Sequence, residues 1–444
     1  MEFECSARRT LQSLVARGRS TMLCGTAFGA EIENGFEMFL TDLEICDPDW
    51  YLESKSFSIQ DTNEDSMNSE EIELLRTTTR RFVRSRLVPL EEQIEAADDV
   101  DEALLAQLRS EVAALGLYGF NLPESIGGPG LSAAAKLAIL DEMTYTSVPL
   151  SEVFGHLPLS LGRCNAEQRD RLLPDFLSGK KILTYALTEP DAGSDLNNLR
   201  TRAEKTDGGW LLNGSKHFIS HAETSNYIIV LAVTDTKASL KRKLTTFIVE
   251  RGNPGIAGMT RYKKMGWRGY HLNGFSLENC FVPDADVLGE PGDGFMSMME
   301  SINHDRILSA CRSTSLAGRA HAMSCDYAKE RSAFGTQLAN HQAIQFMIAD
   351  NDVEIEAGRL LIRRAAELVE ADVPEARIAT ARAKLYASEM GCRVADRALQ
   401  IFGGMGYMCE LPIERFYRDA RAFRIGEGTS EMQRLQIARN ALSA

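Results

Sequence analysis

The most informative part of this chain is residues 400–440, which read QIFGGMGYMCELPIERFYRDARAFRIGEGTSEMQRLQIARN. A glycine cluster closes a helical pattern near the start, and close to the end Glu427 stands between two glycines. Thr429 or Ser430 can cap the helix that follows. A lone carboxylate on a glycine turn before a helix N-terminus fits a general base beside a phosphate-binding helix end. By itself, the stretch is more typical of a solvated glutamate in a loop ahead of an ordinary capped helix.

A second segment, residues 185–195, reads YALTEPDAGSD. Together the two segments resemble the two signature regions of the acyl-CoA dehydrogenase family. The resemblance runs in the family's order from about Met67 to Ala444, so it covers all but the first 66 residues. It implies a mainly α fold with a β insert: an N-terminal helical domain, a central antiparallel β-barrel domain and a C-terminal four-helix bundle.

The resemblance also implies a flavoprotein oxidoreductase of fatty acid metabolism. Such an enzyme would bind FAD and an acyl-CoA substrate, oxidise the acyl thioester between Cα and Cβ, and pass electrons to an electron-transfer flavoprotein. The family is typically a homotetramer, a dimer of dimers with FAD at the interface, and we expect the same assembly here.

Composition sets further limits. The net charge of −14 argues against nucleic acid or an anionic membrane as a main partner. No apolar run reaches the ~18–20 residues needed to span a bilayer. The nine cysteines form no C-x-x-C pair, and His217 and His221 lack a third ligand, so neither a metal site nor a disulfide framework is predicted. These features favour a cytoplasmic location in a bacterium.

Hydrophobic patterning divides the chain into four parts. They are an atypical N-terminal extension (1–66), an N-terminal α domain (67–181), a central β domain (182–290) and a C-terminal α bundle (291–444). Helices are predicted at 133–144, 151–161 and 166–177, and strands at 210–214, 227–234, 244–250 and 274–282.

The first 66 residues differ in character from the rest. Four arginines among serines and threonines are typical of a transit peptide, which would place the protein in the mitochondrial matrix. Glu2, Glu4 and the acidic stretch 42–65 argue against that interpretation. We hypothesise that Met67 is the working start; a short interaction or regulatory segment is the alternative.

By resemblance, Glu427 is the base that removes the α-proton, and its own backbone N–H helps polarise the thioester carbonyl. Asp305 is a rival base, because a minority of the family carries its base just before the arginine at position 306. Gly426 stands where several members carry Tyr, which predicts a wider cavity that tolerates branched or cyclic acyl groups. Residues 149–156 are expected to line the cavity floor. The expected substrate contacts are Ser194, Asn303, Asp305, Arg306 and Gly428.

The FAD contacts implied by the resemblance come from two parts of the chain. In the β domain they are Tyr185, Leu187, Thr188, Gly193, Ser194, Phe218, Ile219 and Ser220. In the bundle they are Arg331, Phe334, Gln342, Gln400, Gly403, Gly404, Thr429 and Glu431. Ser220 keeps a hydroxyl for flavin N5, and Arg331 would bind the pyrophosphate of a neighbouring subunit's FAD. Phe218 and Glu431 depart from the Trp and Gln that the family usually carries.

Two other functions fit the same sequence. The first is a sister activity on this fold, an acyl-CoA oxidase or flavin monooxygenase that uses O₂. Against it, the chain ends soon after the bundle and retains the glutamate base. The second is a non-catalytic scaffold that keeps the fold for assembly, which the intact Glu427 and flavin motifs disfavour.

Overall fold

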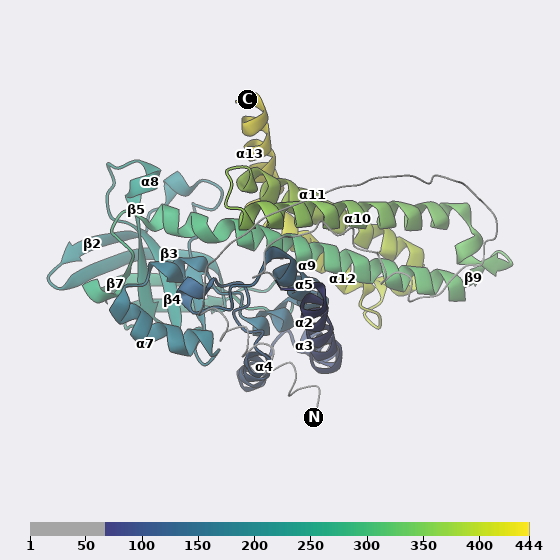
Figure 1. The fold of residues 1–444 in the computed structure, drawn as a ribbon, viewed down its shortest axis with the longest axis horizontal. Coiled ribbons are helices and arrows are strands. Elements are labelled where there is room, and N and C mark those ends of the chain that lie inside the picture. Colours follow the sequence, from purple (N-terminus) through teal and green to yellow (C-terminus); the bar gives the residue numbers. More distant parts are fainter. Residues whose placement is uncertain (1–66, 444) are drawn as a thin grey trace, which may run out of the picture. The chain divides into compact units, whose positions relative to one another are not determined.

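The computed structural model describes residues 67–443, and residues 68–443 belong to one compact unit. The predictions made for residues 1–66 lie outside the described residues. Figure 1 shows a helical part at the start of the described chain, then β strands, then a set of long helices. This is the order that the sequence predicts.

The N-terminal part is built from capped amphipathic helices. The first helix, α2 (Ser69–Phe82), starts with a capping box in which Asn68 accepts from the Glu71 N–H and Glu71 accepts from the Asn68 N–H. Its apolar face buries Leu75 and Phe82. The remaining helices are α3 (Glu91–Ala97), α4 (Glu102–Ala114), α5 (Ala133–Met143), α6 (Val148–Ser151) and α7 (Ala166–Leu177).

The helix predicted at 151–161 is wrong. The chain instead forms short 3-10 turns at Glu152–Phe154 and Leu159–Arg163. Gly155 separates them with φ at +61°, and a Cβ there would lie 2.3 Å from the Tyr118 ring. A left-handed residue at such a close approach stops a helix. The break turns residues 152–156 toward the later helices.

The central part is one eight-stranded sheet in the order β6-β7-β3-β2-β4-β5-β8, with β1 paired to β4. Its strands are β1 (Leu183–Ala186), β2 (Arg202–Thr206), β3 (Gly209–Ser220), β4 (Tyr227–Val233), β5 (Leu244–Glu250), β6 (Ile256–Arg261), β7 (Leu272–Pro283) and β8 (Val287–Leu288). Pairing is mainly antiparallel, but β1 runs parallel to β4. The predicted barrel is not closed in the described residues, because β6 and β8 remain the two edges of the sheet.

The C-terminal part consists of long helices that lie side by side (Figure 1). They are α9 (Gly294–Glu330), α10 (Gln342–Glu370) and α11 (Ala376–Phe402), followed by the shorter α12 (Ile413–Ala420) and α13 (Ser430–Leu442). Helices α9 and α11 run in the same direction: Thr380 donates to Asn303 near their starts. Tyr327 stacks on Phe402 near their ends, with ring centroids 4.3 Å apart.

A buried ion cluster joins the N-terminal and C-terminal helices. Glu91, at the start of α3, accepts from Arg319 of α9 and from Arg415 of α12, each at 2.7 Å. The same carboxylate accepts from the Thr146 hydroxyl at 3.0 Å and the Ser147 N–H at 2.9 Å. Burial alone would raise the pKa of Glu91, but these partners outweigh it and hold the pKa below its usual value. The cluster fixes the chain after α5 against the bundle.

Within residues 67–443, none of the helices combines the length and apolar character needed to cross a membrane. In the same range, no group of three or more His, Cys, Asp or Glu side chains is placed to hold a metal ion.

Candidate active site

Glu427 lies on the short loop that joins a 3-10 turn at Arg421–Arg424 to helix α13. Its φ is +55°, and that of Gly428 is +83°. A non-glycine residue in the left-handed region is strained, and such strain occurs mostly at functional sites. Thr429 is the N-cap of α13, as one of the two sequence alternatives predicts, and its hydroxyl accepts from the Met432 N–H. Among residues 67–443, the Glu427 N–H donates to no other backbone carbonyl.

Two buried side chains hold this loop, and no pattern in the sequence indicates either of them. The Lys384 ammonium of α11 donates to the Gly428 carbonyl at 2.8 Å. The Gln433 side chain of α13 donates to the same carbonyl at 2.9 Å and to the Glu427 carbonyl at 3.3 Å. Lys384 is fully buried. Burial lowers its pKa to about 8, although the charge of Glu427 opposes this shift.

Two carboxylates interact electrostatically here: Glu427 on the loop and Asp305 on α9. Glu427 keeps contact with solvent, yet the surrounding protein displaces enough water that burial raises its pKa. Lys384, Arg312 and Arg306 oppose that rise. Burial, and then the charge of Glu427, raise the pKa of Asp305 well above its usual value. Two like charges that interact in this way disfavour each other's ionised form.

Arg306 faces the same region from α9. It is 4% exposed, and its Nε and Nη1 atoms have no hydrogen-bond partner among the described residues. A buried guanidinium with unpaired donors fits a site that receives an anion or a carbonyl oxygen. Asn303, one turn earlier, accepts from Thr380 and so is already engaged within the protein.

Strand β3 places the predicted flavin residues at its end. A register shift in the pairing of β3 with β7, between Lys216 and Ile219, re-aims the side chains. Phe218 takes φ of +57° and is 58% exposed, whereas the Ile219 side chain is buried in the sheet core. The Ser220 hydroxyl accepts from Tyr270 at 2.8 Å, so it keeps its own proton to donate. This arrangement fits a flavin edge stacked near Phe218 and bonded by Ser220.

The segment after β1 is held by a buried ion pair. Lys216 and Glu189 lie 2.8 Å apart, and Lys216 also donates to the Leu187 carbonyl. Tyr185 points into the protein, with its hydroxyl 3.4 Å from Ser297 of α9. Of the five predicted positions in this segment, Gly193 and Ser194 are exposed, and the other three, Tyr185, Leu187 and Thr188, are partly exposed.

Apart from Thr429 and Glu431, the FAD residues predicted in the bundle lie far from the β-domain residues and from the Glu427 loop. Arg331 follows Arg306 by 25 residues, or about 37 Å along α9. Phe334, 99% exposed, sits in the β9 (Ser332–Ala333) to β10 (Thr336–Gln337) turn at the far end of α9 (Figure 1). Gln342 begins α10 there, and the end of α11 brings Gln400, Gly403 and Gly404 to the same end. A single chain therefore does not bring the residues at the far end of α9 together with those of the β domain and the Glu427 loop. Glu431 is exposed on α13, close to the Glu427 loop.

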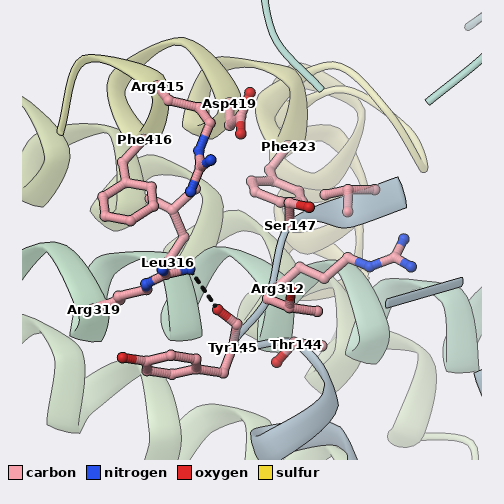
Figure 2. Close-up of a pocket in the computed structure, with 12 residues that line it drawn as sticks. Thr144, Tyr145, Ser147, Arg312, Leu316, Arg319, Arg415, Phe416, Asp419 and Phe423 are labelled. Atoms are coloured by element: carbon pink, nitrogen blue, oxygen red, sulfur yellow. Dashed lines mark hydrogen bonds between the residues drawn. The ribbon is translucent and has the colours of Figure 1, made fainter. Parts of the chain in front are cut away.

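A pocket lies behind the Glu427 loop and is lined by Ser147, Arg312, Leu316, Arg319, Arg415 and Phe423, among others. Figure 2 shows Arg319 and Arg415 on one side of it, and the Arg312 guanidinium pointing away from both. The pocket thus borders the Glu91 cluster, because Thr146, Arg319 and Arg415 line it, and neither Glu427 nor Asp305 does.

The fold and the site define a class: a flavoprotein oxidoreductase with helical, β-sheet and helical parts and a glutamate on the loop before the last helix. Models of the acyl-CoA dehydrogenase N-terminal, middle and C-terminal domains match residues 69–180, 184–280 and 292–442. The human mitochondrial short-chain specific acyl-CoA dehydrogenase is 36% identical over 378 residues, covering 83% of this chain and 90% of that protein. A Bacillus subtilis acyl-CoA dehydrogenase is 34% identical over 84% of this chain and 98% of its own.

Among solved structures, butyryl-CoA dehydrogenase from Megasphaera elsdenii superposes with a TM-score of 0.78 at 30% identity, covering 87% of this chain and all of that chain. The chain belongs to the acyl-CoA dehydrogenase family.

Proposed function

We propose that the protein catalyses FAD-dependent α,β-dehydrogenation of an acyl-CoA thioester to the trans-2-enoyl-CoA, with Glu427 as the base. The main support for this proposal is the Glu427 loop. Its carboxylate lies on a left-handed residue, is reachable from solvent and has a raised pKa, and the buried ammonium of Lys384 donates to the next carbonyl, that of Gly428. A base must take up a proton from a weak carbon acid, and a raised carboxylate pKa increases its driving force for that step.

Glu427 removes the α-proton with its side chain while its backbone N–H faces the thioester carbonyl. Substrate entry would expel water and raise the pKa of Glu427 further. The N–H is available because it serves no carbonyl of the described protein. A preorganised donor of this kind contributes about 2.7–4 kcal/mol to the transition state. Lys384 and Arg306 keep the carboxylate charged until it takes the proton.

Glu427 is a better base than Asp305 because its positive neighbours favour the ionised form. Lys384 is the largest opposing influence on the raised pKa of Glu427. Arg312 and Arg306 also lower the pKa of Asp305, but the charge of Glu427 raises it by more than either arginine lowers it. His156 lies 3.8 Å from Asp305, but burial lowers the pKa of that histidine to about 3, so the ring offers no charge to Asp305. This difference in neighbouring charges favours Glu427 as the ionised base.

FAD, on which the family depends, supplies the hydride acceptor when bound. The open edge at Phe218, Ser220 and Gly193 would hold its ring and the adjoining phosphates. The distant set at Arg331, Phe334, Gln342, Gln400, Gly403 and Gly404 would serve the FAD of a neighbouring copy. At Gly404 no atom lies within 4 Å of the position that a Cβ would take, which leaves room for a phosphate to approach the backbone. The separation of the two sets supports an oligomer in which neighbouring copies share each FAD, and we propose that it is the homotetramer typical of the family.

The test is the visible spectrum of the purified protein, kept anaerobic, before and after a panel of acyl-CoA thioesters is added. Bleaching of a flavin spectrum by one thioester is the expected result. Loss of bleaching in Asp305→Asn but not in Glu427→Gln would reassign the base. If the purified protein carries no flavin, the alternative of a non-catalytic scaffold is favoured.

An electron-transfer flavoprotein is the proposed electron acceptor. Slow reoxidation of the substrate-reduced flavin in air is expected, with rapid reoxidation when that partner is added. Fast reaction with air alone would favour the oxidase or monooxygenase alternative.

Gly426 supports a wide cavity near the reacting carbons. A Cβ at this position would meet nothing closer than the Ala422 carbonyl at 3.8 Å. We expect Gly426→Tyr to reduce kcat/KM for branched acyl-CoA thioesters by about 10-fold or more relative to straight ones, since pocket shape discriminates at that level. An unchanged ratio would contradict the wide-cavity hypothesis.

A further inference from the structure

Tyr270 is the side chain that holds the Ser220 hydroxyl. The Tyr270 phenol donates to the Ser220 oxygen at 2.8 Å, and no other side chain within residues 67–443 is hydrogen-bonded to that oxygen. A phenol is more acidic than an aliphatic alcohol, so Tyr270 is the donor and the serine keeps its own proton. Ser220 lies at the end of strand β3 and stays partly exposed, so this proton can reach a molecule bound outside the sheet.

The Tyr270 ring is packed on several sides. It is 7% exposed, and its edge meets the His221 ring with centroids 4.4 Å apart. On another side it contacts Trp267, at 5.5 Å between ring centroids, and Val148 and Phe423 belong to the same apolar cluster. Close packing holds an aromatic ring in one rotamer, so the hydroxyl at its tip has a fixed position.

The backbone that carries this ring is anchored as well. The Tyr270 N–H donates to the Trp267 carbonyl at 3.0 Å, and the Trp267 N–H donates to the buried Asp419 carboxylate of α12 at 2.6 Å. One residue after each hydroxyl, the His221 N–H donates to the His271 carbonyl at 2.9 Å. The two hydroxyls therefore stand on backbone segments that are hydrogen-bonded to each other.

The surroundings of the phenol keep it protonated. Burial, and to a lesser degree the negative charges of Glu152 and Glu427, raise the pKa of Tyr270 above its usual value. Arg312 and the bond to Ser220 oppose that rise without cancelling it. The phenol is therefore a donor at neutral pH.

We propose that Tyr270 is a positioning residue for FAD: its hydroxyl holds the Ser220 hydroxyl in place and directs the serine proton toward the flavin ring. The inference rests on the proposed FAD-dependent dehydrogenation and adds to it a residue that lies outside the flavin motifs. A hydroxyl that already accepts one hydrogen bond is also a stronger donor, because neighbouring hydrogen bonds polarise one another. Tyr270 thus orients and strengthens the hydrogen bond from Ser220 to the ring.

The test is a double-mutant cycle on the purified flavoprotein with Tyr270→Phe, Ser220→Ala and the variant that carries both. Phenylalanine keeps the packed ring and removes only the hydroxyl. Tyr270→Phe should lower the rate of anaerobic flavin reduction by an acyl-CoA thioester about 10-fold or more, since it weakens two linked hydrogen bonds. Because Tyr270 acts through Ser220, the double variant should be no slower than Ser220→Ala alone.

The midpoint potential of the bound flavin, measured by reductive titration, gives a readout that does not need the reaction. Tyr270→Phe and Ser220→Ala should shift the midpoint in the same direction, and the double variant should shift it no further than Ser220→Ala. Tyr227→Phe is the matched control, because Tyr227 is 9% exposed in the same sheet and donates to Glu250 at 3.5 Å. It should leave the midpoint unchanged, and any effect it has on the rate should add to that of Ser220→Ala.

The outcomes separate the two proposals. If thioesters reduce the flavin but the effects of Tyr270→Phe and Ser220→Ala add, or neither variant moves the midpoint, dehydrogenation stands and the positioning role is overturned. If the midpoint shifts are coupled as expected yet no thioester reduces the flavin, Tyr270 positions Ser220 and the proposed reaction is wrong. Protein that binds no flavin overturns both.

Discussion

Two charged clusters of this protein, one around Glu91 and one around Glu427, differ in how their charges are balanced. At Glu91, two arginines, a hydroxyl and a backbone N–H surround one carboxylate, and its pKa is held below its usual value. At Glu427, a second carboxylate lies close by, buried donors of Arg306 remain unpaired, and the pKa values of both acids are raised. The first arrangement stabilises the fold, and the second is typical of a functional site.

The largest expected effect is that of Glu427→Gln. It should lower the rate of anaerobic flavin reduction by about 10²–10⁴-fold, since a positioned base contributes that much. The folded protein should be at least as stable as the wild type near pH 7. A carboxyl of raised pKa favours folding fully below its unfolded pKa of about 4.3 and loses that contribution as the pH rises through the folded pKa. Rates and thermal midpoints of the same preparations check both points. A thermal midpoint of Glu427→Gln below that of the wild type would contradict the view that the Glu427 cluster does not stabilise the fold.

Glu91→Gln should show the opposite pattern. Its loss leaves Arg319 and Arg415 buried without their counter-ion, which costs about 3–5 kcal/mol of stability. The pKa of Glu91 is lowered, so its contribution is present above the unfolded pKa of about 4.3 and is lost as the pH falls through the folded pKa. Unfolding in denaturant at pH 7 and at pH 4 should show a difference between wild type and variant that shrinks in acid.

The matched control for that variant is Glu111→Gln, which breaks an exposed pair with Arg86. It should cost no more than about 1 kcal/mol. Equal losses in the two variants would mean that the Glu91 cluster contributes no more than a surface ion pair.

The two clusters also differ in how far the sequence predicts them. Glu427 stands out because glycines flank it and a capping residue follows, all within a few positions. Glu91 has no such local sign, since its partners Thr146, Arg319 and Arg415 come from distant segments. Pairing of this kind is set by tertiary packing, which residue patterns along one chain do not record.

The difference between local patterns and tertiary packing also explains which other predictions from the sequence are confirmed and which are wrong. The four predicted strands and the order of the parts are local or family-level features, and the structure has them. Lys384 was missed because it interrupts an apolar helix face, and only the fold shows that the Gly428 carbonyl meets it. The error at 151–161 was avoidable, because Gly155 and Pro158 are helix-breaking residues within that range.

The smallest effect on flavin reduction is expected for Lys384→Met. This variant tests whether charge balance at Glu427 tunes the base. The variant removes a positive charge that lowers the pKa of Glu427 and one of two side-chain bonds to the Gly428 carbonyl. Gln433 still holds the loop, so we expect a loss of about 10-fold in flavin reduction at pH 7, in line with one hydrogen bond between a charged donor and a carbonyl.

The pH dependence separates charge from loop support. Flavin reduction needs the ionised base, so its rate rises with pH through the pKa of Glu427; without Lys384 that pKa is higher, and the acid limb should move to higher pH. Lys216→Met is the matched control, because Lys216 is also fully buried and its pKa is also lowered to about 8, but it pairs with Glu189. The control should lose stability while its acid limb stays in place. If the limb moves in neither variant, Lys384 supports the loop without tuning the base, and charge balance is then set by Arg306 and Arg312.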